Sequence, residues 1–489
     1  MAALKKQTAA GFSLFLYNLA HLASEKKVRK KQWKELKSDE KQSRRNYKRI
    51  YERKGEEMLG GGSFLAQDKV LPGTYINFVN AGAASPVIGI RGTAAVPMIL
   101  NWGPVNEVFE VTAEEFQKNS RDIFGYSYGD PAMMPVRELF RNMTKGIFCR
   151  INGGEKASNN YSTARYSGIL GNSLMTVISK HVDNENQYDV KTLLFGKEMD
   201  KQTVISAADL KDNEYVTFKA DAALSETAGT SLTGGTNGTD VTEQDYTGFL
   251  EKMESRSFQI LCCPAPGEQV KELFAAFTKR MREENGIKFQ TVMHQYSQAD
   301  YEGIISVENQ TEEDPGGLIY WTAGAEAACA VNETIENKVY NGEYTVKTEY
   351  TQAQLSEGIT AGKLLFHKVG DEVRVLRDIN TLTSYTAEKG NDFSSNQTIR
   401  VLDQIGNDIA AIFNNRYLGK IPNDEAGRVS LWNDIVTYVK QMAGRRAIEA
   451  VKSDDIQVEK GQTKRSVVVN FPVEPINSMS QLYMTVVVQ

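Results

Sequence analysis

Short apolar runs alternate with amphipathic stretches after residue 58, and this pattern predicts a small α/β unit within residues 58–154. Thr112 is followed three residues later by Glu115, which indicates a capping box at the start of a helix. A second helix is predicted at Pro135–Met143. Strands are predicted at Val87–Ile90, Ala95–Leu100, Glu107–Val111 and Gly146–Ile151.

The pattern changes within residues 155–239, where strand-like pieces alternate with polar turns. Strands are predicted at Met175–His181, Gln187–Phe195 and Tyr215–Phe218. The stretch Ser225–Thr239 is rich in Gly, Thr and Ser, which predicts a loop. An inserted β-sandwich or barrel fits this arrangement.

Residues 240–376 return to an α/β pattern. Gly370-Asp371 lies between two strand-like runs, Leu364–Val369 and Glu372–Leu376, and this predicts a hairpin. The helices expected in this region are Asp245–Ser255, Glu268–Glu284 and Gly316–Val331, and its strands are Phe258–Cys263, Phe289–Met293 and Gly303–Val307.

The last predicted domain covers residues 377–489 and combines helices with strands. Apolar side chains at helical spacing predict helices at Gln397–Tyr417 and Ser430–Val451, and strands are expected at Arg465–Val473 and Leu482–Val488. The fold class is therefore α+β multidomain, and 489 residues suffice for two to four domains.

Two extended apolar segments lie near the ends of the chain, around residues 70–79 and 481–489. A lone apolar strand leaves N–H and C=O groups that invite pairing with another chain. Glycine and proline beside these segments, at Gly60–Gly62, Pro72-Gly73, Pro472 and Pro475, suit hinged tethers. The pattern favours a lattice subunit over an enzyme. The expected inter-subunit strand arms are Tyr75, Ile76, Asn77, Phe78, Val79, Leu482, Tyr483, Met484, Thr485, Val486, Val487 and Val488.

Five segments, in this order, carry a family resemblance: QDKVLPGTYINFVNA, IGIRGTAAVPMILNWGP, FRNMTKGIFCRINGG, ARYSGILGNSL and NDFSSNQTIRVLDQIGNDIAAIFNNRYLGK. Together they resemble contractile phage tail sheath proteins of low-GC Gram-positive bacteria, over about residues 62–489. The resemblance implies a tail-sheath fold with α/β core domains and an inserted β-sandwich. It also implies that residues 377–489, with the N-terminal arm, form an inner handshake domain against a tail tube.

The resemblance further implies hexameric rings stacked as a helix, in which each subunit donates strands to its neighbours. The expected partners are other copies of the chain, the tail tube, and baseplate and terminator proteins. Contraction would drive the tube through a cell envelope without a cofactor. The expected location is a virion or a phage-tail-like particle, assembled in the bacterial cytoplasm. Another tail or baseplate protein is the alternative, and a cytoplasmic hydrolase is a further one.

Charge separates the first 57 residues from the remainder. They carry 16 Lys and Arg against 7 Asp and Glu, a net charge of +9, which leaves −14 on the rest of the chain. An acidic body argues against a nucleic-acid surface. Four interpretations of the basic segment stay open: a signal peptide, a membrane-surface helix, a solvated tail, or translated upstream sequence. The last of these applies if Met58 is the physiological start. The region 58–154 would then hold the first native domain.

The sequence offers few groups for catalysis. Its four histidines, His21, His181, His294 and His367, form no zinc motif, and no G-x-S-x-G elbow is present. The acidic run at Glu312–Asp314 suits a solvated loop better than a cation site. Cys149, Cys262, Cys263 and Cys329 are too scattered for a disulfide framework, which fits a reducing compartment. We therefore expect no catalytic residue, no metal and no cofactor.

Overall fold

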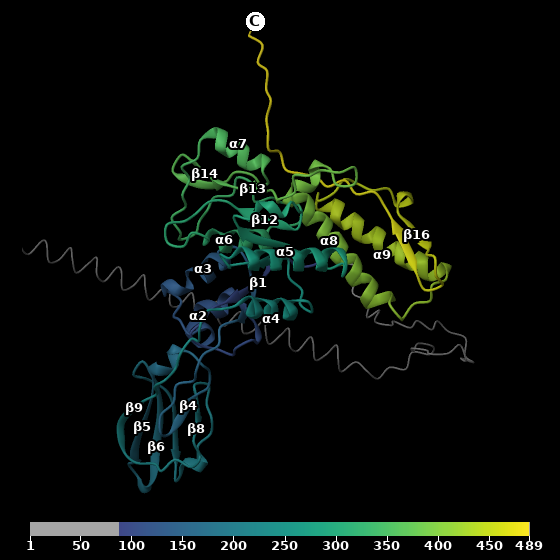
Figure 1. Cartoon of the computed structure of the whole chain (residues 1–489). Helices are drawn as coiled ribbons and strands as arrows, with labels where there is room; N and C mark the ends of the chain where they lie inside the picture. The colour runs from purple at the N-terminus through teal and green to yellow at the C-terminus, as the bar shows by residue number, and fades with distance from the viewer. Residues whose placement is uncertain (1–87, 489) are drawn as a thin grey trace, which may run out of the picture. The chain divides into compact units, whose positions relative to one another are not determined.

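The computed structural model describes residues 88–488 (Figure 1). The basic segment 1–57 and the predicted arm at Tyr75–Val79 lie outside these residues.

A seven-stranded sheet forms the centre of the described chain, in the order β13-β12-β11-β10-β1-β3-β2. Neighbouring strands are parallel except β2, which runs antiparallel to β3. Ala94 in β1 (Thr93–Met98) pairs with Ile260 on one side and Gly146 on the other. The two predicted α/β regions therefore share one sheet. Its strands are β1 (Thr93–Met98), β2 (Val108–Thr112), β3 (Lys145–Arg150), β10 (Ile260–Cys262), β11 (Gln290–His294), β12 (Ile304–Val307) and β13 (Lys363–Leu364).

Helices cover both faces of this sheet because alternate strand residues point to opposite sides. Val96 belongs to a core with helices α2 (Ala113–Phe124), α3 (Met134–Phe140) and α6 (Leu318–Ala328). Ala95 belongs to a second core, with α4 (Glu243–Met253) and α5 (Glu268–Glu283). The predicted capping box is confirmed, since Thr112 and Glu115 bond reciprocally at the start of α2. Helix α7 (Gln352–Thr360) was not expected from the sequence.

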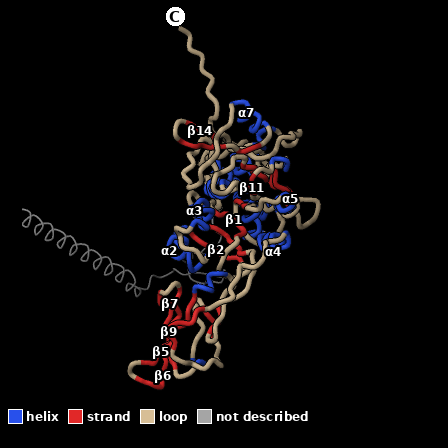
Figure 2. Tube along the Cα trace, turned by 60° about the vertical axis from the view of Figure 1, so that its left-hand side comes forward, coloured by secondary structure: helices blue, strands red, loops and turns tan. Residues whose placement is uncertain are grey.

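The inserted segment forms two antiparallel sheets that share a hydrophobic core. One is β4 (Ser162–Ala164) with β8 (Val216–Phe218). The other has the order β7-β6-β5-β9, and Figure 2 shows its strands side by side in red. Their bounds are β5 (Leu174–His181), β6 (Asn184–Leu194), β7 (Lys197–Val204) and β9 (Thr227–Ser231).

The prediction that Ser225–Thr239 is a loop is wrong. Its residues Thr227–Ser231 form β9, which pairs antiparallel with β5 at the edge of the sheet. The side chains of β9 are mostly exposed, so the strand is held by backbone pairing and its sequence shows no apolar alternation.

The C-terminal region contains two long helices and a small sheet. Helix α8 (Asn396–Ile412) continues into a π-helical turn at Phe413–Tyr417, and α9 covers Glu425–Gly444. Helix α9 begins at Glu425, five residues before the predicted start at Ser430. The Asp424 side chain caps this start by accepting a hydrogen bond from the Gly427 backbone N–H. The small sheet pairs β16 (Gln457–Lys460) with β17 (Val467–Asn470). The predicted hairpin is confirmed as β14 (Phe366–Val369) and β15 (Glu372–Val375).

Two predicted strands are absent from the described chain. Residues 88–90 form none, because the Gly89 N–H donates to the Asp408 carboxylate, 3.1 Å from Oδ2, and Ile90 faces solvent. The segment Leu482–Val488 also forms no strand within a single chain, since it has no neighbour to pair with.

Candidate inter-subunit arm and its surroundings

The C-terminal segment leaves the folded body after a short series of anchors. Backbone bonds join Glu449 N–H to Glu474 O at 2.8 Å and Ile476 N–H to Ala447 O at 3.0 Å. The last anchor is the Ser478 N–H, which donates to the Gln397 side-chain oxygen at 2.9 Å. Beyond it the chain is extended and carries no strand pairing. We call residues 479–488 the C-terminal arm (Figure 1).

The C-terminal arm exposes a series of mostly apolar side chains. Leu482 is 85% exposed, Met484 75% and Val488 89%, and Tyr483, Val486 and Val487 are similar. Contiguous apolar surface of this kind marks an interaction site in a soluble protein. The predicted C-terminal arm residues therefore lie together and free of the body, whereas Tyr75–Val79 lie outside the described residues.

The β16–β17 sheet has little internal support. It has only two strands within residues 88–488, so both outer edges lack a neighbouring strand. One face, with Val458, Val467 and Val469, packs on the core of α8 and α9, while Val468 is 42% exposed. A two-stranded sheet is marginal alone. Its free edges can accept a further strand.

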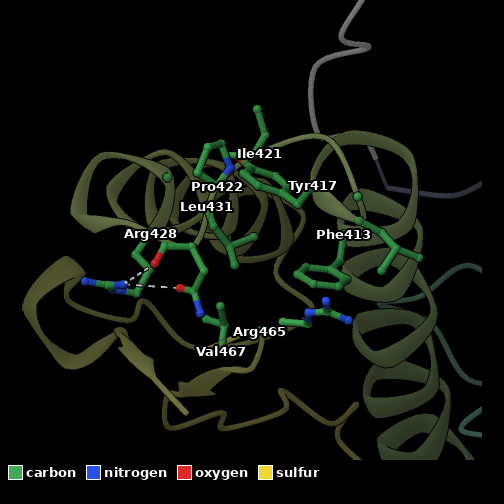
Figure 3. Close-up of a pocket in the computed structure, with 12 residues that line it drawn as sticks. Phe413, Tyr417, Ile421, Pro422, Arg428, Leu431, Arg465 and Val467 are labelled. Carbon is green, nitrogen blue, oxygen red and sulfur yellow. Dashed lines mark hydrogen bonds between the residues drawn. The ribbon is translucent and has the colours of Figure 1, made fainter. Parts of the chain in front are cut away.

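A pocket of about 100 Å³ lies beside this sheet (Figure 3). The rings of Phe413 and Tyr417 stack in its wall, 6.3 Å apart between centroids. Arg465, which lies beside the Phe413 ring, Val467 and Leu431 of α9 also line it. The exposed side chains of Leu418 and Ile421 also line it. Neither this pocket nor strand β16 was predicted, because β16 is only four residues long and the pocket joins distant parts of the chain.

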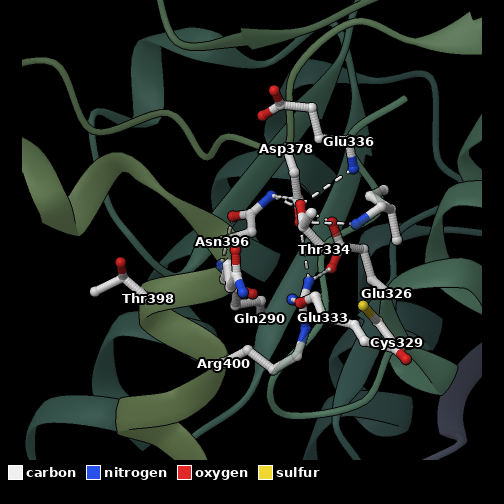
Figure 4. Close-up of polar contacts among 12 residues, drawn as sticks. Gln290, Glu326, Cys329, Glu333, Thr334, Glu336, Asp378, Asn396, Thr398 and Arg400 are labelled. Atoms are coloured by element: carbon white, nitrogen blue, oxygen red, sulfur yellow. Dashed lines mark hydrogen bonds and ion pairs between the residues drawn. The ribbon is translucent and has the colours of Figure 1, made fainter. Parts of the chain in front are cut away.

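A buried ion network joins the C-terminal helices to the central sheet (Figure 4). The Arg400 guanidinium of α8 lies 2.5 Å from a Glu326 oxygen of α6 and 3.2 Å from an Asp378 oxygen. The Asn396 amide donates to both carboxylates. Thr334 donates its hydroxyl proton to Asp378. A second buried pair, Arg282 of α5 with Asp403 of α8, fixes the same two regions against each other.

This network places two buried carboxyl groups next to one guanidinium, so one of the two carboxyl groups keeps its proton. Burial, and then the charge of Asp378, raise the pKa of Glu326 to about 8. Burial also acts to raise the pKa of Asp378, but the Arg400 charge and hydrogen bonds from Asn396 and Thr334 hold it below its usual value. Glu326 therefore carries the proton and Asp378 the negative charge at neutral pH.

The stability of the folded chain is expected to fall as pH rises towards 8. The unfolded Glu326 carboxyl loses its proton near its ordinary value of 4.5, whereas the folded one keeps it to about 8. Between these values the folded state binds more protons, so its stability decreases with pH, by at most about 1.4 kcal/mol per unit. Denaturant midpoints of wild type and Glu326→Gln, measured from pH 5 to 8, should diverge in favour of the variant. Parallel curves would contradict the assignment.

The remaining candidate groups serve the fold. All four cysteines are buried and free, as expected for structural thiols, and burial raises the pKa of Cys149 to about 11. Glu313 accepts hydrogen bonds from Thr345, and Asp314 accepts one from the Gly316 N–H. No group of three His, Cys, Asp or Glu side chains within residues 88–488 could hold a metal ion. No helix in this part of the chain is long and apolar enough to cross a membrane.

Four family models match consecutive parts of the chain. The Gp18 domain III N-terminal region of the tail sheath protein matches residues 91–145, and the phage tail sheath protein beta-sandwich domain matches 152–237. The central domain of the phage tail sheath protein matches residues 239–381, and the phage tail sheath C-terminal domain matches 388–489.

Individual relatives agree with these models. The phage-like element PBSX protein XkdK of Bacillus subtilis is 32% identical over 469 residues, 88% of this chain and 99% of that protein. The crystal structure of a sheath tail protein from Desulfitobacterium hafniense is 34% identical, with a TM-score of 0.73 over 83% of this chain and 98% of that one. The contracted helical sheath of the anti-feeding prophage is 11% identical, with a TM-score of 0.51 over 86% and 99%, and shares the fold.

The chain belongs to the phage tail sheath protein family. This confirms the predicted α+β fold with an inserted β-sandwich, and it places the protein in a phage tail or phage-like particle. It also favours the predicted sheath subunit over the tube, baseplate and hydrolase alternatives.

Proposed function

We propose that copies of this chain stack as hexameric rings around a tail tube, tethered by strands exchanged between neighbours, and that contraction drives the tube through a target envelope. The observation that carries the proposal is the C-terminal arm, seven of whose apolar side chains are at least 70% exposed, beside a body that contains a two-stranded sheet with free edges. Assembly takes place in the bacterial cytoplasm, with baseplate and terminator proteins at the two ends. The protein's role is structural and uses no cofactor.

Strand exchange supplies both affinity and connectivity. A strand added to β16 or β17 satisfies backbone groups that now lack a strand partner, and its side chains fix the register. Each 100 Å² of apolar surface that it buries contributes roughly 2.5 kcal/mol. The arm can keep neighbours joined while the subunit bodies rotate, so a contracted lattice that buries more surface is reached without nucleotide hydrolysis.

Electron microscopy of the purified full chain tests the proposal. Long hollow cylinders are expected, because the subunits alone carry the tethers. A solution of monodisperse monomers at all concentrations would count against it.

We propose that the subunit divides along the sequence boundaries into four regions, of which the two α/β regions share the central sheet. Residues 58–154 hold the N-terminal arm and a small α/β region, 155–239 the β-sandwich, 240–376 the central α/β region and 377–489 the inner handshake domain. The N-terminal arm, Tyr75–Val79, is the second proposed tether. Residues 1–57 stay outside this scheme.

The β-sandwich is expected to be dispensable for assembly. Its entry and exit lie side by side: the Asn152 amide donates to Asn237 O at 3.0 Å, and the Glu155 and Thr236 backbones are joined at 3.1 Å. Replacing residues 156–235 with a short Gly-Ser link should therefore leave the central sheet intact and cylinders present. Stability should fall moderately, because the buried Trp102 loses its cover.

Microscopy and thermal unfolding check this expectation. The variant is designed around whole strands because removing only Ser225–Thr239 would take away β9. A folded variant that forms no cylinders would show that the sandwich carries lattice contacts.

A further inference from the structure

Asparagine followed by glycine occurs at four places in the chain, and all four lie within residues 88–488. The pairs are Asn152-Gly153, Asn237-Gly238, Asn285-Gly286 and Asn341-Gly342. Glycine has no Cβ, so its backbone nitrogen can approach the side-chain amide carbon of the preceding asparagine more easily than that of any other residue. The surroundings of each pair decide how readily this approach takes place in the folded protein.

The Asn285-Gly286 pair lies in an exposed turn between α5 and β11. Within the described part of the chain, neither the Asn285 side chain nor the Gly286 N–H makes a hydrogen bond. Gly286 has a φ of 73°, and a Cβ placed there would meet no atom beyond its chain neighbours within 4 Å. The fold therefore holds neither of the two groups that would react.

The other three pairs are held by the fold. In each of them, the asparagine side-chain oxygen accepts a hydrogen bond from a distant residue. The bonds join Asn152 to the Leu100 N–H at 2.7 Å, Asn237 to the Ile169 N–H at 3.0 Å, and Asn341 to the Trp321 indole N–H at 2.8 Å. Rotation of the side chain towards the glycine nitrogen breaks this bond, which has a cost in free energy.

We propose that Asn285 deamidates fastest of the four asparagines and places aspartate and isoaspartate at the end of α5. The Gly286 nitrogen loses its proton and attacks the side-chain amide carbon of Asn285. The bond from that carbon to the amide nitrogen breaks, and ammonia leaves with the proton. Water then opens the five-membered ring. Opening at one ring carbonyl gives aspartate, and opening at the other gives isoaspartate, so water is the one co-reactant.

The modified turn lies between two contacts that join this part of the chain to α8. Before the turn, the Arg282 guanidinium pairs with Asp403 at 2.8 Å, and after it the Lys288 N–H donates to the Asn407 side-chain oxygen at 3.0 Å. Isoaspartate adds one carbon to the main chain of the turn, which strains both contacts. The new carboxylate also lies at the C-terminal end of α5, where the helix dipole disfavours negative charge. Conversion is therefore expected to lower the midpoint of thermal unfolding.

Peptide mapping of the purified full chain tests the proposal. The protein is incubated at mildly alkaline pH and digested with trypsin at intervals, and mass spectrometry measures the fraction converted at each site. Cleavage after Arg282 and Lys288 isolates Asn285 in one short peptide. Conversion at Asn285 is expected to be several-fold faster than at any other pair. In guanidinium chloride the four rates should become similar, because each asparagine is then followed by glycine in an unfolded chain.

A matched variant tests the consequence for stability. Asn285→Gln is compatible with folding because the side chain is exposed, and glutamine forms the corresponding ring far more slowly. After incubation, the unfolding midpoint of the wild type should fall, whereas that of the variant should stay constant.

Each contrary result rejects a stated part of the proposal. Faster conversion at another pair in the folded chain, or equal rates at all four, rejects the assignment to Asn285. The same order of rates in guanidinium chloride shows that the fold does not set the order. An unchanged midpoint in wild-type protein that has converted at Asn285 rejects the effect on the contacts with α8.

Discussion

Deletion of Leu482–Gln489 is expected to leave the body folded and to abolish cylinders. Residues 482–488 make no contact that holds a domain core together: within this segment the one hydrogen bond is from the Tyr483 hydroxyl to Gln481. The cores of the sheet, the sandwich and the C-terminal helices contain none of these residues. Circular dichroism should stay near that of the wild type, while microscopy shows monomers or small rings.

A matched control separates loss of the tether from loss of exposed apolar surface. Val182→Ser with Ile205→Ser removes two side chains on the sandwich that are 92% and 65% exposed. This variant should form cylinders as the wild type does. Cylinders of normal length from the truncated chain would show that the C-terminal arm is not the connector.

Replacement of Arg400 by methionine is expected to lower the free energy of unfolding by about 3–5 kcal/mol. The substitution removes the guanidinium that Glu326 and Asp378 share, and all three side chains are at most 2% exposed. Two buried carboxyl groups then lack a cation. Chemical denaturation of the arm-deleted chain measures the loss without interference from polymerisation.

Arg374→Met is the control for this experiment. Arg374 also pairs with a carboxylate, Glu372, but that carboxylate is half exposed and the pair lies within one hairpin. Its loss should cost no more than about 1 kcal/mol, because exposed pairs contribute little. Similar losses for both variants would show that the buried network contributes no special stability.

The elements with strong local signals were predictable from the sequence. The capping box at Thr112 and Glu115 needs only four residues, and α5 shows its buried side in the spacing of Val270, Phe274, Phe277 and Met281. Strand β9 has no such signal, because its support is the backbone of β5. Local pattern also misplaced the segment at Gly89, whose conformation depends on Asp408, 319 residues later.

The sequence likewise predicted one part of the candidate site and missed the others. The C-terminal arm could be recognised from the sequence because the seven residues Leu482–Val488 are consecutive and mostly apolar. No contact between distant parts of the chain is needed to identify them. The pocket and the ion network could not, since Glu326 lies in a small-residue helix and meets Arg400, 74 residues later, only after α6 and α8 pack. Propensity and periodicity carry no information about such pairings, because both describe neighbours along the chain.

The order of strands in the central sheet has a consequence for synthesis of the protein on the ribosome. Strand β1 lies between β3 and β10, and the sandwich sequence separates these two partners. At 5–20 residues per second, roughly 5–20 s pass between the emergence of β3 and that of β10. During this interval the N–H and C=O groups along one edge of β1 have no partner strand, while the sandwich can already fold. The unpaired edge therefore makes the nascent chain prone to aggregation, and in need of chaperones, at that stage of translation.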